Sequence, residues 1–348
     1  MERVTPKRTC GFVAAAMAAT LGAAARTPAD ELQLTPSLFV GASYDDNLFV
    51  TLPPRYAAGL IVRPAFDATY RPSSRLTFIA STGFDTEYFG DSAVTRWWAG
   101  RSVALSAGYL LDPNTTVSLA GRYALTWYPG TLVPTLGFEY GRRQAEMITL
   151  GASVRRRVRN RLSLQAGYTV ESLRLAGTDR ELHSQFSGDT SAALAISPTT
   201  TVTVRGGPRY VFGKLTPHVG LTVDTRRERI ELSADYGRGK NVAFDRPLLT
   251  EAYSLRATYR LSPRATLSVS PGLYRHWERA DEQRVWRVGA QATWRVHRLV
   301  GMHASYQYIR QALGLAARVG AAAARWPTTR STLIAGFTVA APRGEVAK

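Results

Sequence analysis

The sequence predicts an all-β fold, a transmembrane antiparallel β-barrel of sixteen strands, from three observations. Apolar and polar residues alternate with a period of two along most of the chain, as in strands with one apolar and one polar face. Short turns and longer connections separate these strands in alternation, which is the pattern of membrane barrels. After residue 25, no apolar run is long enough for a membrane helix. One misread hairpin would change the count to fourteen or eighteen strands.

A basic N-terminus precedes the long apolar run Phe12–Ala25, which ends in three alanines. A basic start, a short apolar stretch and a small-residue end describe a secretory signal peptide, so we expect residues 1–25 to be removed on export. Cys10 is the one cysteine of the chain, and the mature protein is therefore expected to have no disulfide bond or thiol nucleophile. The barrel is predicted to occupy residues 26–340, followed by a short tail at 341–348.

The first strand is predicted at about Leu32–Ser43 and the last strand at about Ser331–Val339. Two internal strands are less regular. Alternation is loose in Leu182–Ile196, and Pro217 interrupts Lys214–Asp224 because proline cannot donate a ladder hydrogen bond. The alternation is clearest in Leu76–Tyr88, Val117–Trp127, Leu162–Val170, Val202–Phe212, Tyr253–Leu261 and Val285–Val296.

Seven tight turns join the strands in pairs, so both termini are expected at the end of the barrel that carries the short turns. Four turns contain proline beside Ser, Asp or Asn, which is the residue chemistry of tight turns. The turns are Arg71–Ser74, Asp112–Thr115, Val158–Asn160, Ser197–Thr200, Arg226–Glu228, Ser262–Ala265 and His297–Arg298. The longer loops are Asp45–Arg55, Tyr128–Gln144, Leu173–Glu181, Gly237–Leu248 and Gln311–Thr329.

Aromatic residues gather near the predicted strand ends, where membrane barrels carry girdles at the two interfaces. A soluble sandwich would pack its apolar faces against each other and usually has shorter strands. The girdle residues are predicted to be Tyr70, Tyr88, Tyr109, Trp127, Tyr168, Tyr236, Tyr259, Trp294 and Tyr306.

Charged residues inside the strands are expected to point into the lumen, because an arginine or lysine that faces lipid near mid-membrane costs roughly 2–4 kcal/mol. The basic set is Arg63, Arg122, Arg155, Arg205, Arg209, Arg256, Arg260, Arg287 and Arg295. The acidic set is Asp67, Asp85, Glu87, Glu171, Asp224, Glu231 and Asp235. Sixteen strands are enough to enclose an aqueous channel. The arginines either bias which solutes pass or pair with carboxylates and stiffen the wall.

A nucleic-acid partner is not expected, although the formal net charge is +18. The bases are spread over strands and turns and are not gathered on one helix. The runs Arg155–Arg157 and Arg226–Arg229 fall at short turns. There they are expected to be solvated or to touch anionic lipid headgroups.

No catalytic constellation is predicted, and the chain is not expected to be an enzyme. His303 and Ser305 share a strand face and look like the His-x-Ser pair of lipid A deacylases, but their phase points them into the lumen, away from a lipid substrate. The acid that follows them is Glu345 in the tail, so no neighbouring carboxylate is expected to orient the imidazole. HExxH and calcium-loop motifs are absent, and no metal or other cofactor is expected.

The first strand runs into a short motif made of Tyr44, Asp45, Asp46, Asn47, Leu48 and Phe49. This motif, together with turns such as Leu261–Leu267 and Leu111–Val117, resembles the β-barrel porins found with exopolysaccharide and exosortase systems. The resemblance implies an outer-membrane channel through which a polysaccharide is exported, and it implies no catalytic residues. Many outer-membrane barrels end in an aromatic residue that resembles the signal read by the assembly machinery. Here either Phe337 in the last strand serves within an internal assembly signal, or the tail that follows it is tolerated.

We therefore expect a monomeric barrel in the outer membrane of a Gram-negative bacterium, a channel for hydrophilic solutes whose leading role is export of an anionic exopolysaccharide. The alternatives are a general diffusion porin, a barrel enzyme acting on lipid, and a structural or adhesive barrel plugged by Tyr128–Gln144 or Gln311–Thr329. The expected partners are outer-membrane lipid and lipopolysaccharide, the outer-membrane assembly machinery, and periplasmic polysaccharide-export proteins that dock on the basic turns.

Overall fold

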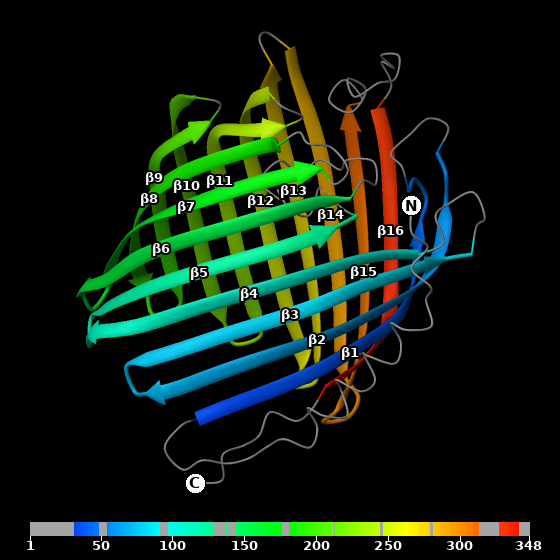
Figure 1. The fold of residues 1–348 in the computed structure, drawn as a ribbon, viewed down its shortest axis with the longest axis horizontal. Helices are drawn as coiled ribbons and strands as arrows, with labels where there is room; N and C mark the ends of the chain where they lie inside the picture. The colour runs from blue at the N-terminus through cyan, green and yellow to red at the C-terminus, as the bar shows by residue number, and fades with distance from the viewer. Residues whose placement is uncertain are drawn as a thin grey trace.

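In the computed structural model, sixteen antiparallel strands form one closed barrel in which each strand pairs with its neighbours in sequence and β1 pairs with β16 (Figure 1). The structure describes residues 31–48, 54–90, 97–127, 137, 144–175, 181–211, 213–243, 246–278, 281–312 and 327–340. The strands are β1 Glu31–Asp45, β2 Ala57–Ser73, β3 Leu76–Phe89, β4 Trp97–Asp112, β5 Thr115–Thr126, β6 Ala145–Arg159, β7 Leu162–Leu175, β8 Glu181–Ser197, β9 Thr200–Val211, β10 Lys214–Arg227, β11 Ile230–Ala243, β12 Arg246–Ser262, β13 Ala265–Glu278, β14 Asp281–Arg295, β15 Val300–Ala312 and β16 Pro327–Ala340. The predicted fold class and strand count are confirmed.

Tight turns close one end of the barrel, which we call the turn end; the opposite end is the loop end. Side-chain oxygens help to form several turns, since Asp112 Oδ1 accepts from the Asn114 amide at 2.7 Å, and Ser262 Oγ accepts from the Arg264 amide at 3.2 Å. Such side-chain acceptors mimic a backbone turn. All seven predicted turns lie at the turn end.

Two predictions about individual segments are wrong. Gly237–Leu248 is not a long loop, because β11 continues to Ala243 and β12 begins at Arg246. Pro217 does not interrupt β10; it stands opposite Pro208 of β9. Both prolines lie where the pairing with the strand on their other side is interrupted. Pro217 precedes His218, the first residue of β10 that pairs with β11, and the pairing of β8 with β9 skips Gly188 and Asp189 opposite Pro208. A missing N–H therefore costs no ladder bond there.

The outer face of the barrel is apolar and carries the aromatic girdles. Leu105, Leu119 and Leu150 are among its most exposed side chains. Eight of the nine predicted girdle residues lie in this outward phase. Trp127 does not: it stacks on the buried ring of Trp98 with centroids 5.3 Å apart. Tertiary packing at the loop end draws this ring inward.

Several predictions concern residues at or beyond the ends of the described chain. The predicted signal peptide at 1–25 and the tail at 341–348 lie outside the described residues. Phe337 lies on β16, is 52% exposed on the outer face, and pairs with Val40 and Met302. Its role in assembly stays a prediction. Within the described chain, no helix is long and apolar enough to cross a membrane.

Candidate functional site

The candidate site is the inner wall of the barrel, which the strand register defines. Ile61, Glu87 and His276 are nearly inaccessible on this face, with 1%, 3% and 1% of their surface exposed. Side chains in one register row share a face of the sheet, so the row of each residue can be followed around the closed barrel. All members of the predicted basic and acidic sets share the inner face with these buried residues.

Hydroxyl groups link neighbouring strands along this wall. Thr222 donates to Asp235 Oδ1 at 2.6 Å, Thr258 and Ser268 are bonded at 2.9 Å, and Thr266 and Thr293 at 2.6 Å. A hydroxyl group can both donate and accept a hydrogen bond, so these short side chains satisfy one another across neighbouring strands. The wall is thus polar at these positions, whereas Phe89 and Trp98 form a buried apolar cluster with Leu48 on the same face at the loop end.

Some charged groups of the inner wall are paired. Arg63 Nε lies 2.8 Å from Asp85 Oδ1, with both side chains about one third exposed (34% and 39%). Glu231 lies between Arg226 and Arg260, at 3.1 and 3.9 Å. These partly exposed pairs are of the kind that contributes roughly 0–1 kcal/mol each to stability.

Other arginines of this wall have no carboxylate within ion-pair distance among the described residues: Arg122, Arg155, Arg256 and Arg295. Arg287 donates to the neutral Gln307 Oε1 at 3.0 Å. Asp67 and Asp224 likewise have no base within that distance in the described chain. Since the arginines outnumber the carboxylates in the two sets, the wall keeps a basic excess.

A denser polar cluster, only part of which was predicted from the sequence, occupies the wall at β8–β11. His218 Nε2 contacts Asp189 Oδ1, with the His218 side chain 8% exposed and the Asp189 side chain 45% exposed. Arg209 Nη1 donates to Asn241 Oδ1 at 2.5 Å. The alternation in β8 is loose, so its phase could not be assigned securely and Asp189 was missed.

The chain between β5 and β6 touches the opposite wall at one described residue. Gly137 lies against the ring of Tyr274 on β13, seven strands further around the barrel, and a Cβ at Gly137 would collide with that ring. Gly137 also has a φ of 71°, which favours glycine. Gly137 therefore lies inside the barrel at this level. Apart from Gly137 and Gln144, the segment Tyr128–Gln144 lies outside the described residues.

The motif at the end of β1 forms the seam between the first and last strands. Arg330 of β16 makes a two-pronged contact with Asp45, with Nη2 and Nε at 2.6 and 3.0 Å from Oδ2, and both side chains are buried. Asp46 accepts from the Ser331 amide at 2.6 Å, and Asn47 donates to Thr329 O at 3.0 Å. Tyr44 points outward and is 48% exposed; Phe49 lies outside the described residues.

The histidine considered for catalysis is on the inner face. The ring of His303 stands edge-on to Phe39 at 6.0 Å, and Phe39 in turn lies under the Arg63 guanidinium at 5.7 Å. Among the described residues, no group of three or more His, Cys, Asp or Glu is arranged to hold a metal ion.

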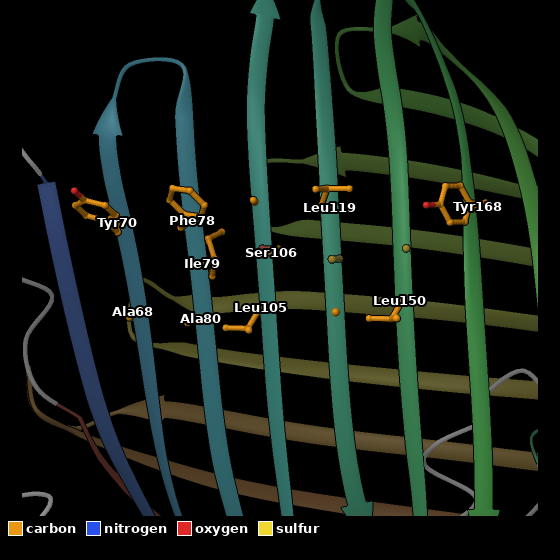
Figure 2. Close-up of a pocket in the computed structure, with 14 residues that line it drawn as sticks. Ala68, Tyr70, Phe78, Ile79, Ala80, Leu105, Ser106, Leu119, Leu150 and Tyr168 are labelled. Atoms are coloured by element: carbon orange, nitrogen blue, oxygen red, sulfur yellow. The ribbon is translucent and has the colours of Figure 1, made fainter.

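A shallow hollow on the barrel is apolar and lies on the outer wall (Figure 2). Tyr70 and Phe78 stack at one side of it with centroids 6.2 Å apart, and Leu105, Leu119 and Tyr168 project from the neighbouring strands. All five stand in the outward phase of their strands. The hollow is therefore a feature of the outer surface of the barrel and lies apart from the inner wall.

A closed sixteen-strand barrel with a polar, charged inner wall is the fold of the outer-membrane porins. No family model and no curated protein matches the chain. Solved structures with this fold include OmpF of Salmonella typhi in complex with daunomycin, at a TM-score of 0.55 and 11% identity over 90% of this chain and 98% of that chain. An anion-selective porin from Comamonas acidovorans gives 0.50 and 12% over 90% and 100%. OpdK of Pseudomonas aeruginosa with vanillate gives 0.51 and 8% over 88% and 99%.

Proposed function

We propose that this protein is a channel of the Gram-negative outer membrane that passes hydrophilic solutes. The observation that carries the proposal is the division of the closed barrel into an apolar outer face and an inner wall of hydroxyl and charged groups. A barrel of this strand number can hold an aqueous channel. The fold shared with the porins supports the same reading, and the proposal includes no catalytic step.

We propose further that anions are favoured. Arg122, Arg155, Arg256 and Arg295 add positive charge that no carboxylate within ion-pair distance offsets in the described chain. Guanidinium groups stay charged and present planar pairs of donors to carboxylates and phosphates. A solved neighbour described as anion-selective shares the fold. The arginines of the inner wall are the residues assigned to this preference.

The finer proposal is export of an anionic exopolysaccharide. Its support is the motif Tyr44–Phe49 at the end of the first strand, together with arginine-rich turns on which periplasmic export proteins would dock. The second candidate is a general diffusion porin, with which the closed sixteen-strand barrel is equally consistent. Gly137 against Tyr274 fits that candidate too, because it narrows the interior.

The test is single-channel conductance of the refolded mature protein in a planar bilayer, with a salt gradient to measure ion selectivity. We expect a stable, anion-leaning conductance. Charge reversal at Arg256 and Arg287 should move the reversal potential toward cations, whereas Arg101→Glu on the outer face of β4 should leave it unchanged. A correctly folded, heat-modifiable barrel that does not conduct would overturn the channel, and an unchanged reversal potential would overturn the role of the arginines.

Polymer block separates the two channel candidates. An exporter should be blocked by an anionic polysaccharide and much less by a neutral one of equal length, while a diffusion porin should pass small ions in the presence of either. For the alternative of a barrel enzyme acting on lipid, His303→Ala is decisive: an enzyme would lose its activity, and the channel proposed here should conduct as before.

A further inference from the structure

A group of charged residues lies on the outer face of the barrel at the loop ends of β11–β14, although strand-internal charges were expected to point inward. We call Arg238, Glu251, Arg275, Glu282 and Arg284 the outer charged cluster. Arg275 stands between Tyr274 and His276, which are buried inside the barrel. Side chains alternate between the faces of a strand, so Arg275 and its register partners Glu251 and Arg284 project outward.

The strand register gives the depth of this cluster. One register row holds Tyr236, Tyr253, Leu273 and Trp286, with the rings of Tyr236 and Tyr253 5.2 Å apart and Trp286 51% exposed. Such outward aromatic rows mark the interface between hydrocarbon and headgroups in membrane barrels. The next row toward the loop end holds Arg238, Glu251, Arg275 and Arg284. The outer charged cluster therefore lies at headgroup level, just beyond the aromatic row.

Two carboxylates hold the three arginines together. Glu282 accepts from Arg275 Nε and Nη2 at 2.9 and 3.1 Å and from Arg284 Nε at 2.7 Å. Glu251 lies 3.5 Å from Arg238 Nε and 3.6 Å from Arg275 Nη1. The side chain of Arg275 is further fixed over the ring of Trp277 at 4.9 Å. The guanidinium groups are thus pre-positioned, which lowers the entropy lost when they bind a ligand.

The cluster has a surplus of positive charge that points outward. The two glutamates are 11% and 27% exposed, whereas Arg238 and Arg284 are 52% and 60% exposed. Exposed Lys240 and Arg310 lie in neighbouring outward positions of β11 and β15. Each arginine has five N–H donors, and the contacts with Glu251 and Glu282 occupy only some of them.

We propose that the outer charged cluster binds the phosphate groups of an anionic glycolipid in the outer leaflet of the membrane. The proposal rests on the outer-membrane placement proposed above, in which the loop end faces outward. Phosphate is the ligand that paired guanidinium groups recognise best, and basic pockets at membrane interfaces bind phosphorylated headgroups. A lipid fits better than a free phosphate, because the row of Tyr253, Leu273 and Trp286 beneath the arginines offers apolar surface to acyl chains.

The experiment measures binding of bis-phosphorylated lipid A to the full mature barrel in phosphatidylcholine nanodiscs by native mass spectrometry. The variant is R238Q/R284Q, which changes two exposed side chains, and the control is Arg101→Gln, another outward arginine at the loop end of β4. Heat-modifiability on a gel shows that each variant is folded. We expect R238Q/R284Q to weaken lipid A binding by about tenfold, the loss of one to two charge-assisted hydrogen bonds, with Arg101→Gln unchanged.

Two further binding measurements identify the ligand. Lipid A without phosphates should bind the wild-type barrel as weakly as bis-phosphorylated lipid A binds R238Q/R284Q, and inorganic phosphate should not compete. Equal binding of lipid A to variant and wild type would overturn the proposal, as would full competition by inorganic phosphate. R238Q/R284Q should conduct normally. A wild-type barrel that binds lipid A through these arginines but carries no current would overturn the channel and support this site.

Discussion

The strongest stability prediction concerns Arg330, which joins the last strand to the first. Its guanidinium contacts both carboxylate oxygens of Asp45, and the two side chains are only 6% and 2% exposed. Arg330→Met keeps much of the volume and removes the charge. Asp45 is then left as a buried carboxylate without its arginine, at the point where the barrel closes.

The expected loss follows from burial. Removing one partner of a buried ion pair costs about 3–5 kcal/mol, because the remaining charge has given up its hydration. The pair Arg63–Asp85 is joined by one contact of 2.8 Å and is about one third exposed, so Arg63→Met should cost about 0–1 kcal/mol. Asp46 and Asn47 still bond to β16 in Arg330→Met, so the barrel should close but unfold more easily.

The assay is the free energy of unfolding from urea titration in lipid vesicles, with the heat-modified gel shift as a second readout. The double variant D45N/R330M should recover most of the lost stability, since it leaves no buried charge. Equal losses for Arg330→Met and Arg63→Met would refute the argument from burial. A double variant as unstable as Arg330→Met would refute the argument that the buried charge of Asp45 causes the loss.

Two further predictions concern glycines. Gly137→Ala places a methyl group against the ring of Tyr274 and strains a backbone with φ of 71°. It should therefore displace this contact and change the single-channel conductance, while the free energy of unfolding in urea stays within about 1 kcal/mol of wild type. An identical conductance would show that Gly137 does not shape the path of ions through the barrel. Gly41→Ala drives a methyl group into the backbone oxygen of Ala335 across the seam. Overpacking of this kind lowers the free energy of unfolding by about 1–3 kcal/mol. The control in the same urea titration is Gly237→Ala, whose added methyl group meets no atom within 4 Å.

The inner wall could be predicted from sequence because the information is local. A period of two assigns a face to each residue of a strand without knowledge of its neighbours. Arg63 and Asp85 could therefore be placed on one face, although their 2.8 Å contact could not. Contacts of the seam were beyond reach for another reason: Asp45 and Arg330 are 285 residues apart, and only the closing register brings them together.

The outer charged cluster shows where the local rule fails. The rule that charged residues point inward assumes that each strand ends with the membrane. β11 and β12 instead run on beyond the row of Tyr236 and Tyr253, and Arg238 and Glu251 stand outward in the next row. Near the interface an outward charge costs little, about 0–1 kcal/mol. Only the register against neighbouring aromatic residues tells such a position from one at mid-membrane.

The different environments of the arginines lead to a final prediction about salt. The Debye length is about 10 Å at 0.1 M and about 3 Å at 1 M, so exposed charges are screened while buried pairs are largely spared. Anion selectivity that depends on Arg256 and Arg295 should therefore fall steeply as salt is raised at a fixed gradient ratio. The stability difference between wild type and Arg330→Met should stay nearly constant over the same range, because Arg330 and Asp45 are buried. Selectivity that persists at 1 M would locate the discriminating charges in a narrow, desolvated part of the lumen, and the contact of Gly137 with Tyr274 would then be the first place to look for it.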